Sequence, residues 1–158
     1  MFRVGIGYDI HRLKKGRALW LGGVKIPFAK GLDGHSDADA LLHAIIDALL
    51  GAASLPDIGH YFPPSDQSIK NISSATMLAR AVSEVYMSGY RIENIDSVII
   101  AEAPKIAPHR DAMRATIAKL LKIPTRDIQI KGKTNEGLGD IGKGNAIAAQ
   151  AVALLKKR

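Results

Sequence analysis

Two histidines and one aspartate have the types and spacing needed to bind a transition metal. Asp9 and His11 end a segment, residues 2–11, whose alternation predicts a β-strand, so their side chains point the same way. His43 lies in a segment with helical periodicity. Two imidazoles and a carboxylate, with a fourth position left open, are the ligand pattern of a catalytic zinc site. An aspartate two residues before a histidine is common by chance, so this spacing alone does not establish the site.

The helix predicted around His43 has two different faces. Its start is indicated by Ser36 and Asp39, which resemble a capping box, and its end by Gly51. The apolar residues recur at intervals of three and four: Leu41, Leu42, Ile45, Ile46 and Leu49. On the opposite side lies a polar stripe: Ser36, Asp39, His43 and Asp47. The stripe is either a solvated face or the support of a metal-binding imidazole, with Asp39 and Asp47 as alternative partners of His43.

A second group of residues that could do chemistry follows a predicted strand over 128–133. Glu136 could bind a hard cation such as Mg²⁺ together with phosphate oxygens, and Thr134 could donate to a phosphate. A capped surface turn is the competing interpretation of Thr134-Asn135-Glu136.

The glycines after this group match a dinucleotide-binding fingerprint, Gly137-x-Gly139-x-x-Gly142. We reject that interpretation because the fingerprint must open a βαβ unit. Only sixteen residues follow Gly142, and no further strand is predicted among them. We expect these glycines to let the backbone approach a phosphate or a neighbouring subunit closely.

Composition limits the class of protein. The 158 residues are 47% hydrophobic and 23% charged, which is typical of one globular domain. Cysteine is absent, so a transition-metal site must use histidine and carboxylate ligands. The formal charge of +7 comes from scattered residues and suits a small polyanionic ligand better than nucleic acid. No apolar run could span a bilayer and the start has no signal-peptide pattern, so we expect a cytoplasmic protein.

The remaining periodicities predict an α/β (α+β-type) fold, formed by a single domain over residues 1–158. We expect a mixed sheet covered by helices, plus a small β-hairpin over 19–26 around Gly22-Gly23. An ordered loop is expected over 55–66 and a glycine-rich connection over 134–144. The other predicted elements are strands over 95–101 and 128–133 and helices over 73–88, 109–122 and 145–155.

Five motifs along nearly the whole chain resemble one family, 2-C-methyl-D-erythritol 2,4-cyclodiphosphate synthase. They are Gly7-Tyr8-Asp9-Ile10-His11, the stretch from Gly34-His35-Ser36-Asp37 to His43, Asp57-Ile58-Gly59, Ala101-Glu102-Ala103-Pro104-Lys105, and Lys133-Thr134-Asn135-Glu136-Gly137. The resemblance implies a homotrimer around a three-fold axis, with active sites between subunits. It implies conversion of 4-diphosphocytidyl-2-C-methyl-D-erythritol 2-phosphate to the 2,4-cyclodiphosphate and CMP.

The resemblance also assigns roles to residues. Asp9, His11 and His43 would bind Zn²⁺, Glu136 would place a second ion, Mg²⁺ or Mn²⁺, and His35 and Thr134 would stabilise the transition state. The positions implied to contact the substrate, a small cytidine diphosphate compound, are Asp9, His11, His35, Ser36, Asp57, Ile58, Gly59, Phe62, Asp66, Ala101, Ala103, Pro104, Lys105, Ile106, Ala107, Lys133, Thr134, Asn135, Glu136, Asp140 and Lys143.

The sequence departs from the family pattern at four positions. Many members have lysine at the position of Gly137 and arginine at that of Lys143. Some also have phenylalanine at the position of Asp140 and glutamate at that of Gln150. The last three positions belong to the family's central cavity. Lys143 can still attract a phosphate there, but Asp140 and Gln150 argue against the binding of an isoprenoid diphosphate that the resemblance would otherwise imply. Two other functions are compatible with the sequence alone. One is a zinc-dependent phosphoesterase, and the other is a basic nucleic-acid-binding trimer, which would lose affinity steeply with salt.

Overall fold

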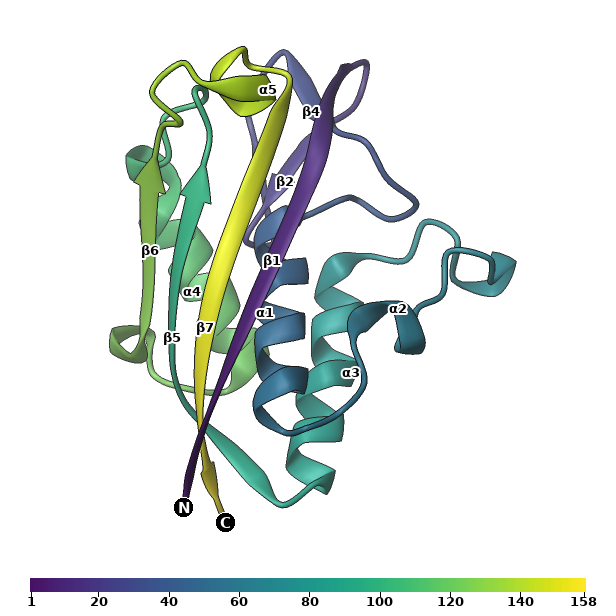
Figure 1. Cartoon of the computed structure of the whole chain (residues 1–158), viewed down its shortest axis with the longest axis vertical. Helices are drawn as coiled ribbons and strands as arrows, with labels where there is room; N and C mark the ends of the chain where they lie inside the picture. The colour runs from purple at the N-terminus through teal and green to yellow at the C-terminus, as the bar shows by residue number, and fades with distance from the viewer.

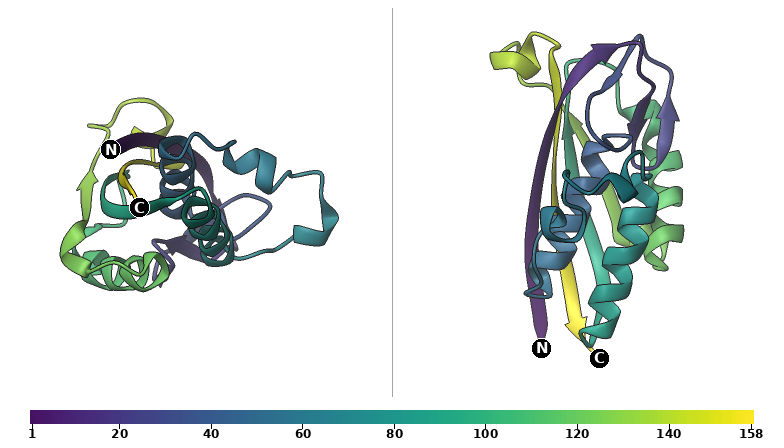
Figure 2. Two further views of the ribbon diagram at one scale, coloured as in Figure 1. Left: turned by 90° about the horizontal axis from the view of Figure 1, so that it is seen from below. Right: turned by 90° about the vertical axis from the view of Figure 1, so that its right-hand side faces the viewer.

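A five-stranded mixed sheet forms the frame of the protein, with helices on one of its faces (Figures 1 and 2). The computed structural model describes all 158 residues. The strand order is β4-β1-β7-β5-β6, in which only the pair β5 and β6 is parallel. The strands of this sheet are β1 (Phe2–Lys15), β4 (Lys30–Leu32), β5 (Tyr90–Ile100), β6 (Ile128–Lys133) and β7 (Ala146–Lys157). A separate hairpin, β2 (Leu19–Leu21) and β3 (Val24–Ile26), turns at the predicted Gly22-Gly23.

The prediction of a helix over 145–155 was wrong, because this segment forms the central strand β7. Its alanines favour a helix in isolation, but the segment pairs along its length with β1 on one side and β5 on the other. Small side chains at Ala149, Ala151 and Ala153 are fully or almost fully buried beneath the helices, while Gln150 and Val152 are exposed. The sequence does not show this period as an alternation of polar and apolar residues, because Val152 is apolar, and pairing with β1 and β5 overrides the helix propensity.

Helices predicted from periodicity are confirmed at three places: α1 (Ala40–Ala52), α3 (Ser74–Met87) and α4 (Arg110–Leu121). Two short helices lie in the predicted loops, α2 (Ile58–Tyr61) and α5 (Gly139–Gly142), and 3₁₀ turns occupy Gln67–Ile69, Ala107–His109 and Thr125–Asp127. Asp39 caps α1 by accepting a hydrogen bond from the Leu42 N–H, so the N-cap is Asp39 and not Ser36. The helix begins at Ala40 and ends at Ala52, one residue past the expected end at Gly51. A strand does follow Gly142, contrary to the expectation. However, α5 is too short to be a crossover helix, and β7 runs antiparallel to β5, the parallel partner of β6, so no βαβ unit is formed.

Two glycines of β1 let α1 lie directly on the sheet. A Cβ atom on Gly5 would come 2.0 Å from the carbonyl oxygen of Ala48, and one on Gly7 would come 1.9 Å from that of Ala44. Helix and strand backbones are therefore in contact, which no larger residue would allow. This contact places the first turns of α1, and with them His43, beside Asp9 and His11, which lie within β1 and not at its end.

The buried carboxylate of Asp39 joins the hairpin to α1. Besides Leu42 it accepts hydrogen bonds from the backbone N–H groups of Gly22, at 3.0 Å, and Gly23, at 2.7 Å. Burial raises the pKa of Asp39, whereas these three donors lower it, and the net direction is upward. Asp39 is therefore a structural residue of the fold.

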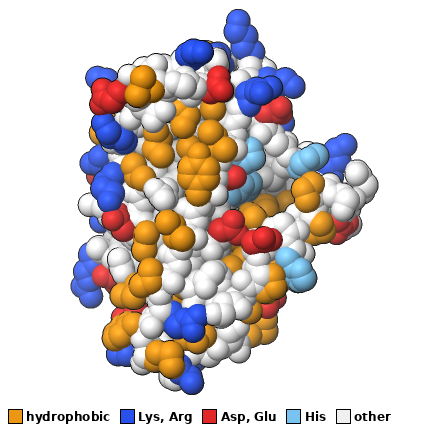
Figure 3. Space-filling view, in the orientation of Figure 1, with side chains coloured by type: hydrophobic (Ala, Val, Ile, Leu, Met, Phe, Trp, Pro, Cys, Tyr) orange, Lys and Arg blue, Asp and Glu red, His pale blue; other side chains and the backbone are white.

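The other face of the sheet carries a strip of exposed apolar side chains. On β1 the side chains of Phe2, Val4, Ile6, Tyr8 and Ile10 are between 45% and 67% exposed. Figure 3 shows hydrophobic side chains running along this face. Hydrophobic surface of this kind is characteristic of protein–protein interfaces. None of the helices has the length and apolar character needed to cross a membrane.

Candidate active site

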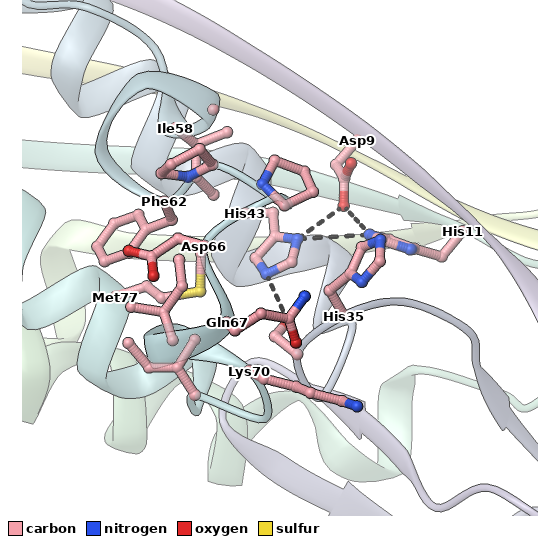
Figure 4. Close-up of a pocket in the computed structure, with 16 residues that line it drawn as sticks. Asp9, His11, His35, His43, Ile58, Phe62, Asp66, Gln67, Lys70 and Met77 are labelled. Carbon is pink, nitrogen blue, oxygen red and sulfur yellow. Dashed lines mark hydrogen bonds and ion pairs between the residues drawn. The ribbon is translucent and has the colours of Figure 1, made fainter.

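Asp9, His11 and His43 converge on one point, where strand β1 passes the start of α1 (Figure 4). The Asp9 Oδ2 atom lies 2.8 Å from His11 Nε2 and 3.2 Å from His43 Nδ1, and the two ring nitrogens are 3.4 Å apart. Their ligand atoms all lie within 4.8 Å of one another. Because all three side chains are largely buried, with exposed fractions between 11% and 26%, a metal ion there would be held mainly by the protein.

Hydrogen bonding determines which nitrogen of His11 faces this point. His11 Nδ1–H donates to the Asp33 carbonyl at 2.7 Å, so Nε2 is the nitrogen that faces Asp9 and His43, and in the neutral ring Nε2 has the lone pair that a metal would use. Burial lowers the pKa of His11, but its hydrogen bond and charge interaction with Asp9 raise that pKa to a net value above 6.5. Burial likewise raises the pKa of Asp9, while the two histidines lower it by more, to below 3.8. The two histidines therefore stabilise Asp9 in the carboxylate form that a metal requires.

On its other side, His43 contacts serines and not the predicted acids. His43 Nε2 lies 2.9 Å from the Ser74 hydroxyl and 3.3 Å from that of Ser36. Asp39 is engaged with the hairpin, and Asp47 accepts a hydrogen bond from the Ile58 N–H at 2.8 Å. The expectation that one of these acids supports His43 was therefore wrong, because nearer backbone donors hold both carboxylates.

The convergent group lies at one end of a cavity of about 370 Å³. Figure 4 shows His35 beside the metal-binding group, with Phe62 and Met77 farther along the wall. The other lining residues are Ser36, Ile58, Gly59, Pro63, Pro64, Asp66, Gln67, Ile69, Lys70 and Ile72. A cavity with ligand atoms at one end, apolar side chains along the wall and a lysine at the rim suits a small polar molecule with an anionic group.

A second group of predicted residues lies at the carboxyl ends of the parallel strands β5 and β6. The Ala101 N–H donates to the Lys133 carbonyl at 2.9 Å, which joins the two loops that follow these strands. Glu102 accepts hydrogen bonds from the N–H groups of Asn135, at 2.8 Å, and Gly137, at 3.3 Å. The Glu136 side chain is exposed, and a hydrogen bond from Lys133 keeps the pKa of its carboxyl below the usual value.

Comparison with known proteins identifies the family. A family model described as the YgbB family matches residues 2–156. The chain belongs to this family. It is 53% identical over 156 residues to a 2-C-methyl-D-erythritol 2,4-cyclodiphosphate synthase from Synechococcus sp. (strain JA-2-3B'a(2-13)), covering 99% of both chains. It is also 53% identical to the synthase of the same name from Burkholderia lata, covering 99% of this chain and 98% of that protein.

Solved structures of other YgbB-like proteins have the same fold. The IspF protein of Plasmodium falciparum, solved as a CDP complex, superposes with a TM-score of 0.87 at 39% identity, covering 99% of this chain and 97% of that one. The bifunctional IspDF protein of Campylobacter jejuni gives a TM-score of 0.96 at 37% identity, and this chain spans 43% of its length. The resemblance to the synthase family is thus confirmed, as is the predicted mixed α/β fold.

Within this YgbB-family chain the predicted site residues fall into two separate sets. The first set lines the cavity: Asp9, His11, His35, Ser36, His43, Ile58, Gly59, Phe62 and Asp66. Asp57 adjoins it as the cap of α2. No residue of 101–107, 133–136 or position 143 lines this cavity, and Asp140 instead borders a different hollow beside His11 and Arg12.

Sequence reasoning assigned no role to several residues around this site. Ser74 and Asp37 lie behind His43, and Lys70 lies at the cavity wall. Ser74 could have been found only as the second residue of the helix predicted over 73–88; in the structure it is the first residue of α3. Its proximity to His43 depends on how α3 packs on α1, which the sequence does not reveal.

Proposed function

We propose that this chain is a zinc-dependent phosphorus–oxygen lyase that converts 4-diphosphocytidyl-2-C-methyl-D-erythritol 2-phosphate to 2-C-methyl-D-erythritol 2,4-cyclodiphosphate and CMP. The reaction belongs to the non-mevalonate isoprenoid pathway. The observation that carries the proposal is the convergence of Asp9, His11 and His43 at the end of a substrate-sized cavity. Relatives named for this activity match the chain over nearly its whole length.

The donor set suits Zn²⁺ better than a hard cation. Two imidazole nitrogens and one carboxylate oxygen are typical of open zinc sites, whereas Mg²⁺ prefers oxygen ligands. The Asp33 carbonyl orients His11 as an outer partner of a metal ligand does. When bound, zinc would supply Lewis-acid polarisation of a phosphate oxygen.

The residues of the chain would mainly position the substrate. Its 2-phosphate attacks its own β-phosphorus, so the enzyme provides no nucleophile and works by holding the reacting groups close together. We assign the methylerythritol phosphate to the cavity, near Ser36, Ile58 and Gly59, with Asp57, Phe62 and Asp66 nearby. His35 and Thr134 are assigned to stabilising the charge that develops on the diphosphate.

The loops after β5 and β6 would bind the cytidine diphosphate end. The positions assigned to it are Ala101, Ala103, Pro104, Lys105, Ile106, Ala107, Lys133, Asn135, Asp140 and Lys143. Glu136 would share a Mg²⁺ or Mn²⁺ ion with the diphosphate. The solved IspF relative in its CDP complex supports a nucleotide ligand for this fold.

We further propose that a homotrimer completes the site. The assigned cytidine loops do not line the cavity that contains Asp9 and His43, so a second copy must bring them there. The apolar strip on β1 lies on the opposite side of the strand from these ligands, where it can pack against other copies without covering the cavity. An identical strip on every copy favours a closed symmetric assembly.

Phosphorus NMR tests the proposed reaction. The zinc-loaded protein, incubated with the cytidylated substrate and Mg²⁺, is expected to give the resonance of CMP together with those of a cyclic diphosphate. Release of inorganic phosphate without a cyclic product would identify the rival phosphoesterase. An unchanged substrate spectrum would contradict both enzymatic interpretations.

A further inference from the structure

The outer nitrogen of His43 faces a hydrogen-bonded pair that the proposed reaction does not use. His43 Nδ1 points toward Asp9 and His11, so Nε2 points away from the metal-binding group. There it lies 2.9 Å from the hydroxyl of Ser74, a residue with 0% exposure. The Ser74 hydroxyl in turn contacts the carboxylate of Asp37 closely, and the Ser74 N–H donates to the other carboxylate oxygen at 3.0 Å.

The direction of these hydrogen bonds follows from the chemistry of the groups. A carboxylate only accepts, so the single proton of the Ser74 hydroxyl must go to Asp37. Ser74 then has only lone pairs to offer His43, so Nε2 must carry a proton and donate it. A neutral imidazole protonated at Nε2 has its lone pair at Nδ1, the nitrogen that faces Asp9 and His11.

Asp37 is itself held in place. Its Oδ1 atom accepts the Asp39 N–H at 3.2 Å, and its Oδ2 atom accepts the first N–H of α3. The chain of contacts therefore runs from the start of α3, through Asp37 and Ser74, to α1. It belongs to the fixed frame of the protein, and neither Ser74 nor Asp37 lines the substrate cavity.

We propose that Ser74 and Asp37 are positioning residues that hold His43 in the tautomer and orientation needed to bind the metal through Nδ1. This inference rests on the proposed zinc site and extends it. Such outer partners raise metal affinity by orienting the ligand, and their loss typically costs ten- to a hundredfold. Ser36, at 3.3 Å from the same nitrogen, is a weaker alternative acceptor, because its hydroxyl also accepts the Ala38 N–H.

Zinc affinity of purified variants tests the proposal, measured by competition with a chromophoric chelator. Ser74→Ala is expected to bind Zn²⁺ about ten- to a hundredfold more weakly than the unaltered protein, and Asp37→Asn about tenfold more weakly. The matched control is Ser97→Ala, which removes another buried serine hydroxyl, one that donates to the Gln129 carbonyl and makes no hydrogen bond with a proposed metal ligand. This control should leave zinc affinity unchanged.

A double variant shows whether Asp37 affects zinc binding through Ser74 or independently of it. If Asp37 acts through Ser74, the variant with both changes binds zinc no more weakly than Ser74→Ala alone, whereas independent roles would multiply the two losses. Melting temperatures of the metal-free proteins identify any general destabilisation. Wild-type affinity in Ser74→Ala, an equal loss in Ser97→Ala or a multiplicative loss in the double variant would overturn the proposal.

His43→Ala, measured in the same series, distinguishes failure of this inference from failure of the zinc site itself. If His43→Ala loses zinc and Ser74→Ala does not, only the positioning role is wrong. If His43→Ala keeps its zinc, the proposed metal site is wrong, and the inference falls with it.

Discussion

The backbone of Gly7 lies so close to that of Ala44 that a methyl group on the glycine would come 1.9 Å from the alanine carbonyl oxygen. The contact joins the strand that carries Asp9 and His11 to the helix that carries His43. The convergence of Asp9, His11 and His43 therefore depends on a glycine that has no chemical role.

Gly7→Ala is expected to push α1 away from β1. Overpacking of this kind lowers the free energy of unfolding by about 2 kcal/mol, and the displacement of His43 should weaken zinc binding. Denaturant unfolding and chelator competition measure the two effects. The control is Gly51→Ala in the same helix, where an added methyl group meets no atom within 4 Å and should be neutral or stabilising. Equal behaviour of the two variants would contradict the role of the close contact.

Ile6→Lys is expected to dissociate the proposed trimer. Ile6 is 63% exposed in the isolated chain, and a lysine in a packed apolar interface would bury a charge. Light scattering should then show monomers with little turnover, while zinc remains bound because the ligands lie on the other side of β1. Met87→Lys, which alters an equally exposed residue on α3, should leave the assembly intact. An intact, active Ile6→Lys trimer would place the interface elsewhere.

Glu136→Ala is expected to retain zinc and to lose turnover by about 100-fold, because the ion assigned to the diphosphate would lose its protein ligand. Steady-state CMP release at several Mg²⁺ concentrations measures this loss. Asp111→Asn, at a similarly exposed acid on α4, should behave as the unaltered enzyme. Full activity of Glu136→Ala would remove the proposed role in binding the second ion.

Asp47 provides a pH-dependent prediction. Burial raises its pKa and the charges of Asp57 and Asp9 raise it further, whereas the Ile58 N–H and the charge of His43 lower it, and the net direction is upward from 3.8. The native state therefore binds this proton more tightly than the unfolded state does. Stability is lost as pH rises through the native pKa, and below pH 3.8 the penalty disappears.

Asp47→Asn keeps an acceptor for Ile58 and removes that penalty. The metal-free variant is expected to melt about 2 °C higher than the unaltered protein at pH 7, a gain of less than about 1 kcal/mol, and to show no gain near pH 3. A lower melting temperature at pH 7 would show that the charged carboxylate stabilises the fold.

The sequence predicted those features that depend on local pattern. The strand over 128–133, the hairpin turn at Gly22-Gly23 and the helix over 73–88 follow from periodicity and turn chemistry, and all are present. The strand over 146–157 was missed because its alanine-rich sequence favours a helix until β1 and β5 pair with it. Pairing with strands that are distant in sequence determines the secondary structure of that segment.

In the candidate site, too, local pattern predicted some features, and contacts between distant segments determined the others. Asp9, His11 and His43 could be grouped from residue type and spacing, and the structure brings their ligand atoms within 4.8 Å. Asp39 and Asp47 share the helical stripe with His43, yet backbone donors from distant segments, Gly23 and Ile58, bind their carboxylates. The partner that His43 contacts, Ser74, is 31 residues away in sequence.

The central claim is that Asp9, His11 and His43 hold the zinc on which cyclisation depends. The most direct test measures zinc per chain and CMP release on one preparation of His43→Ala, with its assembly state checked by light scattering. We expect zinc and CMP release to be lost together while the proposed trimer remains assembled. Zinc at the stoichiometry of the unaltered protein, or CMP release at its rate, would contradict the account.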